Sequence, residues 1–405
     1  MHLGTRTGRF PWAAAVLLAL VAAISREGAL IVLAAGVAVA GAVVETTARL
    51  ALLAVEVRAE ARPARVVAGE TFTVTFVVAN RKALPLPWLE VRLDLPEGIE
   101  PAADQQGRAR SSIGAGFGPR PFERVTLRFT LRAAQRGAYA LGPVRIGASD
   151  WLGFIHDDRT LSPGLTLVAY PAPLAVRDRH LASLRPLAET ATRRGLLPDP
   201  LRFRGVREHR TGDARKEIHW KASARLRQLQ TKLYEPATSL DAVFLVNVAS
   251  YDQYWIQADP DATELVVSAA AELLRLAAEA GRQVGLITNG LDNITHERPR
   301  SALGRGPRPL TRSLDILARL GPYAAAAPET VFLRERGRIA WGASLIVVTP
   351  RLGAALAQAC VALRRAHHRV MVVTVQVPPD EIARQVRSNG VAIDVLARPE
   401  ARRAS

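Results

Sequence analysis

Three patterns of apolar and polar positions follow one another along the 405 residues of the chain. Residues 10–24 and 29–44 are two apolar runs, separated by the polar stretch Ser25-Arg26-Glu27-Gly28, and they predict helices at about residues 10–24 and 29–48. Between about residues 53 and 173, apolar and polar residues alternate. Beyond about residue 240, continuous apolar runs of strand length alternate with runs that have helical spacing. These patterns predict a helical region, an all-β region and an α/β region, in that order.

The two apolar runs predict a membrane-spanning hairpin of two helices within residues 1–52. Each run is shorter than the roughly 20 residues that a spanning helix needs, but flanking residues can extend both. Arg6 and Arg9 precede the hairpin and Arg49 and Arg58 follow it, so the positive-inside rule places both ends in the cytoplasm. A cleaved signal peptide is the alternative for the first run, and the second run argues against it. We expect an inner (plasma) membrane protein whose residues 10–48 contact lipid.

The alternating region, residues 53–173, predicts antiparallel strands with one buried face. The alternation is clearest in residues 71–78 and 125–132. Several short strands with intervening turn signals are typical of an immunoglobulin-like β-sandwich. Residues 102–122, rich in Gly, Ser and Arg, predict a mobile loop between strands. Residues 174–202 contain three prolines and predict a linker to the next domain.

The last region, residues 203–405, predicts an α/β domain. Apolar runs predict strands at residues 241–248, 283–288, 343–349 and 369–376, with an edge strand at residues 391–396. Amphipathic spacing predicts helices at residues 262–280, 310–320, 352–367 and 379–388. Such continuous apolar strands indicate a mostly parallel sheet that helices cover on both faces.

Residues 203–235 differ in composition from their surroundings. The chain has 54 lysines and arginines but only four lysines, and three of those four lie in this stretch. Residues 207–215 read REHRTGDAR, residues 218–225 read IHWKASAR, and residues 233–235 read LYE. This pattern resembles the signature of the bacterial "domain of unknown function 58" family, with His209 and Thr211 in place of the usual Tyr and Pro. Residues 136–154 and the pair Tyr170-Pro171 resemble the same family.

That resemblance implies a von Willebrand factor A-like fold for the last region and a protein partner, a MoxR-type AAA+ ATPase. In von Willebrand factor A domains, a D-x-S-x-S motif after the first strand holds magnesium through oxygen ligands. The matching positions here are Asn247, Ala249 and Tyr251, and Ser250 lies between the last two. An amide, a methyl group and a phenol replace the expected ligands, so we expect a degenerate site that binds no metal, and no cofactor.

The net charge of +17 is compatible with nucleic acid, anionic lipid or an acidic protein as partner. Aromatic residues make up only 5% of the chain and do not interleave with the cations, which disfavours binding to nucleic-acid bases. The single cysteine, Cys360, excludes an internal disulfide and fits a buried apolar position. We therefore expect a protein partner and no nucleic acid; the sequence leaves the oligomeric state open.

The signature supplies the candidate partner-binding residues, which are Arg207, Glu208, Arg210, Gly212, Asp213, Arg215, Trp220, Lys221, Arg225 and Lys232. One interpretation is structural: Glu208 and Asp213 pair with Arg215 and Arg225, and Trp220 packs into the core. The other is a cationic surface presented to a partner, and both interpretations can hold together.

No residue is assigned a catalytic role, and the sequence favours a membrane-anchored, non-enzymatic interaction or scaffold protein. The resemblance implies that it serves the assembly or maturation of other complexes, or envelope maintenance. The first alternative is a metal-independent hydrolase that uses His209, Asp213 and His219, although no nucleophile and base stand at a recognisable spacing. The second alternative is nucleic-acid binding through the basic surface.

Overall fold

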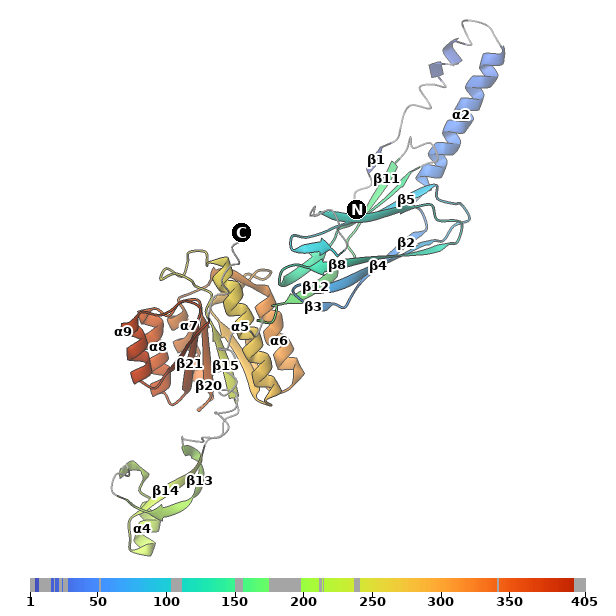
Figure 1. The fold of residues 1–405 in the computed structure, drawn as a ribbon. Coiled ribbons are helices and arrows are strands. Elements are labelled where there is room, and N and C mark those ends of the chain that lie inside the picture. Colours follow the sequence, from blue (N-terminus) through green and yellow to red (C-terminus); the bar gives the residue numbers. More distant parts are fainter. Residues whose placement is uncertain are drawn as a thin grey trace. The chain divides into compact units, whose positions relative to one another are not determined.

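The computed structural model describes residues 4–6, 16–17, 19–21, 24, 28–50, 52–102, 111–149, 156–174, 198–210, 213, 215–236, 241–340 and 342–396 (Figure 1). The chain divides into two compact units, Met1–Tyr170 and Pro171–Ser405. Each unit has its own hydrophobic core.

The membrane hairpin predicted for residues 1–52 is wrong. The second apolar run forms one helix, α2 (Gly28–Arg49), and no second helix of comparable length lies among the described residues before it. In the part of the chain that the structure describes, no helix has the length and apolar character needed to cross a membrane. The sequence of α2 closes with Glu45, Thr46, Thr47 and Arg49, so its uninterrupted apolar part is shorter than the roughly 20 residues required. The fold class and the localisation, both based on two spanning helices, are corrected by the same finding.

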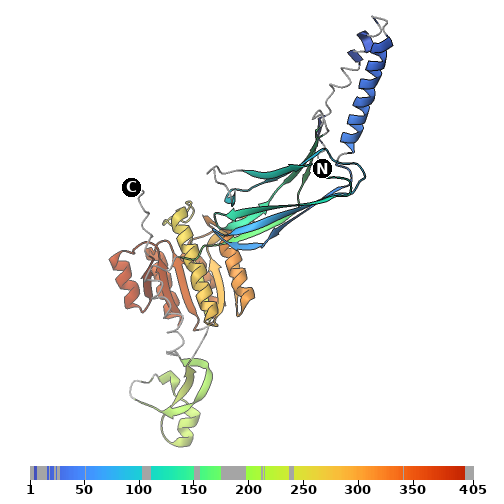
Figure 2. The same cartoon turned by 45° about the vertical axis from the view of Figure 1, so that its right-hand side comes forward.

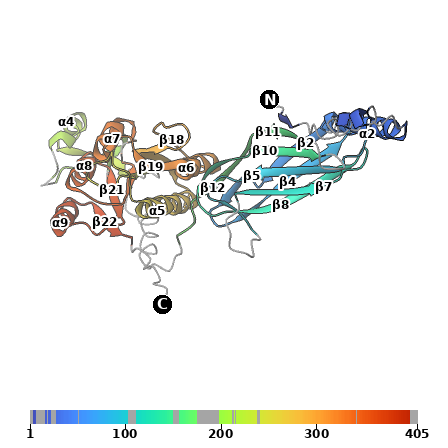
Figure 3. The same ribbon diagram turned by 90° about the horizontal axis from the view of Figure 1, so that it is seen from above.

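The first unit consists mainly of β-sheet. Its strands are β1 (Gly4–Arg6), β2 (Val55–Arg62), β3 (Arg65–Val67), β4 (Thr71–Asn80), β5 (Trp88–Asp94), β6 (Ile99–Pro101), β7 (Ser112–Phe117), β8 (Arg124–Ala133), β9 (Gly137–Leu141), β10 (Val144–Ser149), β11 (His156–Leu161) and β12 (Leu165–Tyr170). They form sheets in the orders β1-β11-β10-β5-β7, β2-β4-β8-β6 and β3-β12-β9. Figure 3 shows β4 and β8 side by side, as their antiparallel register requires.

Alternation along the strands builds the core of this unit. Every second residue of β4, from Phe72 to Val78, is buried, because successive side chains of a strand point to opposite faces. The ring of Phe76 meets the ring of Phe129 on β8 edge-to-face, with centroids 5.9 Å apart. These residues pack with Leu89 and Leu93 of β5 in one continuous cluster.

The mobile loop predicted for residues 102–122 is wrong in its second half, where β7 pairs with β5. Its sequence, SIGAGF, has glycine where an alternating strand would have a side chain, so the pattern is hidden. The ring of Trp88 lies over Gly116 and occupies the space of the absent side chain.

The second unit contains a six-stranded sheet of order β18-β16-β15-β20-β21-β22. Figure 2 shows this sheet, yellow to red, with helices packed beside it. Its elements are β13 (Pro198–Glu208), η1 (Arg215–Glu217), α4 (Trp220–Leu226), β14 (Gln230–Pro236), β15 (Asp241–Val246), α5 (Pro260–Glu279), β16 (Gln283–Thr288), β17 (Gly290–Asp292), β18 (Arg300–Gly304), α6 (Pro307–Arg319), β19 (Leu320–Ala324), α7 (Pro328–Glu335), η2 (Arg336–Arg338), β20 (Ser344–Thr349), α8 (Ala354–Arg365), β21 (Arg369–Thr374), α9 (Asp380–Ser388) and β22 (Ala392–Val395). The strands β16, β15, β20, β21 and β22 are parallel, and β18 is antiparallel to β16.

Helices cover the sheet from both faces (Figure 1). On one face, Val243 and Leu245 of β15 pack with Phe332 of α7 and with Leu356 and Cys360 of α8. The intervening side chains of β15 point to the opposite face. There α5, whose buried residues include Val266 and Leu274, covers the sheet together with α6.

The strand order sets where a ligand or partner can be recognised. The chain leaves β15 for β16 on one side and later returns to β20 on the other side of β15. The loops that follow β15 and β20 therefore diverge at the carboxyl edge of the sheet. In open α/β sheets such a point, where the strand order reverses, is the usual place for binding.

Candidate functional site

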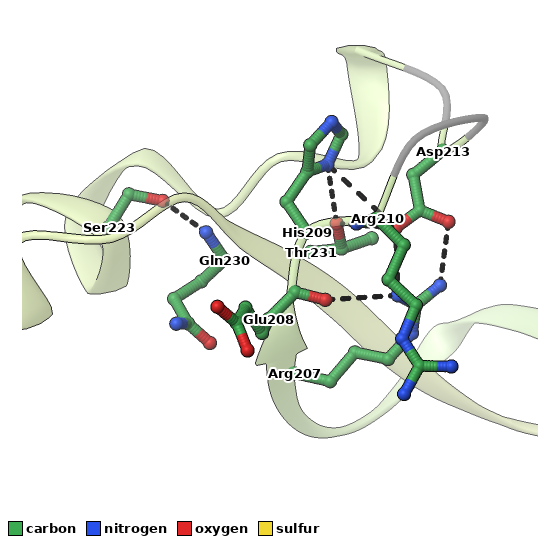
Figure 4. A network of polar contacts seen from close by, with 8 residues as sticks. All are labelled: Arg207, Glu208, His209, Arg210, Asp213, Ser223, Gln230 and Thr231. Carbon is green, nitrogen blue, oxygen red and sulfur yellow. Dashed lines mark hydrogen bonds and ion pairs between the residues drawn. The ribbon is translucent and has the colours of Figure 1, made fainter.

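The signature segment forms a hairpin in which β13 and β14 pair antiparallel. Arg207 stands opposite Thr231, and Glu208 stands opposite Gln230. The connection between the strands carries η1 and α4, and Ile218 makes an isolated bridge to Thr231. Figure 4 shows the side chains of Arg207, His209 and Thr231 gathered near Asp213, and Ser223 next to Gln230.

Asp213 lies at the centre of this polar network. The guanidinium of Arg207 donates two parallel hydrogen bonds to the carboxylate of Asp213, Nη1 to Oδ2 at 2.8 Å and Nη2 to Oδ1 at 2.7 Å. The backbone N–H of Arg210 and the hydroxyl of Thr231 donate to Oδ2 at 3.0 and 3.1 Å. The hydrogen bond from Arg207, followed by that from the Arg210 backbone, lowers the pKa of Asp213 well below its ordinary value. Asp213 is thus an ionised carboxylate that ties both strands to the connection.

His209, Asp213 and His219, the three residues of the hydrolase alternative, all take part in polar contacts within this segment. Nδ1 of His209 lies 2.9 Å from the hydroxyl of Thr231 and 3.8 Å from Oδ2 of Asp213. These three groups resemble a nucleophile with its base and carboxylate, but Thr231 is only 1% exposed and its hydroxyl already donates to Asp213. His219 has a structural role, because its Nδ1 accepts from the backbone N–H of Ala222 and so caps α4.

Helix α4 is held to the hairpin through polar groups at its base. The hydroxyl of Ser223 donates to the backbone carbonyl of His219 at 3.0 Å and accepts from the backbone N–H of Gln230 at 2.8 Å. The backbone N–H of His219 donates to the carbonyl of Gln230 at 2.8 Å. A helix this short would not persist alone in water, so these bonds keep it in place.

The outer side of α4 is exposed, and this corrects two expectations. Trp220 does not pack into a core, because 67% of its surface is accessible. Asp213 pairs with Arg207 rather than with Arg215 or Arg225. Arg215 of η1 and Lys221 and Arg225 of α4 are exposed as well, and we call these three cations together with Trp220 the α4 face.

The remaining signature candidates have varied positions. Glu208 and Arg210 are exposed, Lys232 on β14 is half-buried, and Arg207 is half-buried with its guanidinium engaged by Asp213. Gly212 lies outside the described residues.

At the carboxyl edge of the sheet, the positions that match a metal site hold a closed hydrogen-bond network. Asn247 donates through Nδ2 to the hydroxyl of Thr349 at 2.9 Å and to the carbonyl of Ala249 at 3.2 Å. Its Oδ1 accepts from the backbone N–H of Ala249 at 2.9 Å and from Nδ2 of Asn289 at 2.8 Å. An asparagine side chain has two donors and one oxygen with two lone pairs, so its whole capacity is used.

The other groups at this edge are also engaged. The hydroxyl of Thr349 donates to the carbonyl of Arg351, and the hydroxyl of Ser250 accepts from the backbone N–H of Asp259. Tyr251 points its side chain to solvent, with 50% of its surface exposed. Among the residues that the structure describes, no group of three or more His, Cys, Asp or Glu could hold a metal ion. The donor set around Asn247 does not fit a hard cation, which prefers carboxylates.

The comparison with known families matches residues 205–392 to the model described as "Protein of unknown function DUF58". This part of the chain belongs to the DUF58 family. The match contains both the hairpin connection with Asp213 and the whole network around Asn247. The family description assigns no activity, so these two sites are the basis for a function.

Among curated proteins, the chain is similar to "Uncharacterized protein YeaD" of Bacillus subtilis (strain 168), with 27% identity over 232 residues. That similarity covers 55% of this chain and 53% of YeaD, so the chain spans about half the length of its relative.

Solved structures give no further guidance about this DUF58 protein. One of them, the Pseudomonas fluorescens alkylpurine DNA glycosylase AlkC bound to DNA, has 14% identity and a TM-score of 0.17, over 38% of this chain and 42% of that chain. Another, a non-cellulosomal cohesin from Archaeoglobus fulgidus, has 15% identity and a TM-score of 0.16, over 24% of this chain and 80% of that chain. Such low TM-scores carry no argument about fold or function.

Sequence reasoning missed three residues of these networks in the DUF58 region. Asn289 follows the apolar strand β16 directly, and the rule that singles out polar residues at the ends of buried strands would have found it. No sequence rule singles out Thr231 or Ser223, because hydroxyl residues are common. Their partners, Asp213 and Gln230, lie 18 and 7 positions away in the sequence.

Proposed function

We propose that this DUF58 protein is a non-enzymatic interaction protein that docks through the α4 face on an acidic protein surface. The observation that carries the proposal is Trp220, a large aromatic side chain left exposed on a helix in which no residue is buried. Tryptophan and arginine are the residues that most often dominate protein–protein interfaces. Exposed tryptophan and arginine together are the composition that such interface centres usually have.

The network below the α4 face supports the same conclusion. Asp213, Ser223 and the His219 cap fix the helix with hydrogen bonds of 2.7 to 3.1 Å. A surface that is ordered before binding loses less conformational entropy when it docks. The acids and hydroxyls thus hold the segment, and the outward cations remain available to a partner.

The partner that we expect from the resemblance of the signature is a MoxR-type AAA+ ATPase. Together the two proteins would act in the assembly or maturation of other complexes, or in envelope maintenance. Charge complementarity predicts that the ATPase contributes carboxylates to the contact and that added salt weakens it.

Co-purification of the full chain with a MoxR-type ATPase of the same organism tests the proposal. We expect Trp220→Ala and the pair Lys221→Glu/Arg225→Glu to lower capture of the ATPase by about tenfold or more, as loss of an interface hot spot does. The matched control is Arg334→Glu/Arg387→Glu, which changes the charge equally at exposed arginines in the last turns of α7 and α9. Equal capture by all variants would overturn the proposal. A loss of duplex DNA binding by the α4 variants, with the ATPase captured as before, would favour the nucleic-acid alternative instead.

A further inference from the structure

The loop that follows β15 at the carboxyl edge of the sheet is rich in exposed aromatic side chains. Within residues 250–258, which we call the aromatic loop, Tyr251 is 50% exposed and Trp255 is 68% exposed. The ring of Tyr254 packs edge-to-face on Trp255, with centroids 5.2 Å apart, and Ile256 is also exposed. In a chain with 5% aromatic residues this is an unusual concentration, and it stands where the strand order reverses.

The aromatic loop is held in position from three sides. At its beginning, the hydroxyl of Ser250 accepts from the backbone N–H of Asp259 at 3.1 Å. At its end, the N–H of Ala258 donates to the carbonyl of Pro322 on β19 at 2.9 Å. In the middle, Asp252 pairs with Arg351 of the loop after β20 at 3.0 Å. A rigid aromatic platform of this kind binds at a low cost in conformational entropy.

Several exposed carboxylates lie near the aromatic loop, although the chain as a whole is strongly basic and Arg351 neutralises one of them, Asp252. Asp252 is exposed, and helix α5 opens with Asp261 and Glu264, both exposed. The first turn of α9, at the same edge of the sheet, adds Asp380 and Glu381. This edge therefore suits an occupant that carries cations together with an apolar or aromatic group.

The chain itself contains a surface with that chemistry, the α4 face. Lys221 and Arg225 can stack over the rings of Tyr251 and Trp255 as cation–π pairs, and Arg215 can meet the carboxylates. We propose that the α4 face of one copy docks on the aromatic loop of a second copy of this chain. The inference rests on the proposed function, since it uses the same α4 face, and a second copy would compete with the ATPase for that face.

Such a contact joins two different surfaces, so it is heterologous. Each copy that docks through its α4 face still offers its own aromatic loop to another copy. A heterologous contact forms rings where the rotation closes and open chains where it does not, and it is not limited to a symmetric dimer.

Sedimentation velocity of the full chain tests the proposal over a range of protein concentrations. We expect the wild-type average mass to rise with concentration and to fall as NaCl screens the charges. The α4 variant Trp220→Ala/Lys221→Glu and the loop variant Tyr251→Ala/Trp255→Ala each change only exposed side chains. We expect each to weaken self-association by about tenfold or more, and Leu333→Ala/Arg334→Glu on α7 to leave it unchanged.

Mixing the two variants gives the decisive result. Each variant associates with itself only weakly, but the loop variant keeps an intact α4 face and the α4 variant keeps an intact aromatic loop. At concentrations where each variant alone is monomeric, the mixture therefore forms a one-to-one dimer that does not grow further. A wild-type chain that stays monomeric, or a mixture that does not dimerise, overturns the inference. Capture of the MoxR-type ATPase by the same variants separates docking on the ATPase from self-association. If the wild-type chain is monomeric but the α4 variant no longer captures the ATPase, only self-association is refuted.

Discussion

Replacing Asn247 by aspartate tests whether the carboxyl edge of the sheet is a closed network rather than a weakened metal site. Asn247 donates to Thr349 at 2.9 Å and to the carbonyl of Ala249 at 3.2 Å, and an aspartate at this position has no hydrogen to donate. The two bonds that its Oδ1 accepts, from Ala249 and Asn289, remain possible. The variant would therefore place a carboxylate oxygen against a carbonyl oxygen in a site that is only 2% exposed.

The expected cost at pH 7 is about 2–4 kcal/mol in the free energy of unfolding of the second unit. Leaving a buried acceptor without its donor costs about 1–3 kcal/mol, and a buried charge without a cation adds to that. Because burial disfavours the charged form, the pKa of the new carboxyl in the folded variant lies above its unfolded value of about 3.9. The deficit is therefore smallest below that unfolded value and grows as the pH rises toward the folded pKa.

Hydrogen exchange of the amides in β15 and β20, followed by mass spectrometry, measures this cost in the full chain. We expect protection at pH 7 to fall by about 30- to 1,000-fold, and by less at pH 5. The control Asn293→Asp makes the same chemical change at an exposed position and should alter stability by no more than about 0.5 kcal/mol. If Asn247→Asp were as stable as this control, or if millimolar magnesium restored its protection, the account of a closed network would be wrong.

Three further predictions concern the signature segment and the core. Because the pKa of Asp213 is lowered in the folded state, its ionised carboxylate stabilises the fold fully above the ordinary carboxyl pKa of 3.8, and this stabilisation is lost as the pH falls through the lower folded value. At pH 7, Asp213→Asn should therefore increase the rate of amide hydrogen exchange in β13 and β14. Arg207→Lys should increase it by less. Burial raises the pKa of Cys360 to about 12, so a thiol reagent at pH 8 should label it only in denaturant; rapid labelling of the native chain would contradict its burial. Phe332→Ala should cost about 3–5 kcal/mol in urea unfolding, whereas Leu333→Ala, its exposed neighbour on α7, should cost less than about 1 kcal/mol.

The interpretation of the first apolar run shows where a local pattern is insufficient. Residues 10–24 and 29–48 have the composition of helices, and the second run does form α2. A spanning hairpin needs both runs to be long and apolar enough, and the polar residues after Val44 interrupt the second run. Likewise, β7 was not predicted, because its glycines interrupt the alternation of apolar and polar side chains. Pairing with β5 supplies the backbone hydrogen bonds that make it a strand.

By itself the sequence determined the parts of this protein that depend on neighbouring residues. Alternation predicted strands such as β4 and β8, and apolar runs predicted β15 and β16. The signature in residues 203–235 indicated the DUF58 family, whose model matches residues 205–392. Each of these signals lies within a few residues of chain, where the geometry of a strand or helix relates sequence spacing directly to a face.

Only the tertiary structure decided which side chains meet. It paired Asp213 with Arg207 and not with Arg225, and it left Trp220 exposed. It also joined Asn247 to Thr349, although 102 positions separate them in the sequence. Such partners are chosen by strand register and by packing across the sheet. Among many arginines and hydroxyls of equal chemistry, sequence spacing alone contains no information about which of them comes within hydrogen-bonding distance.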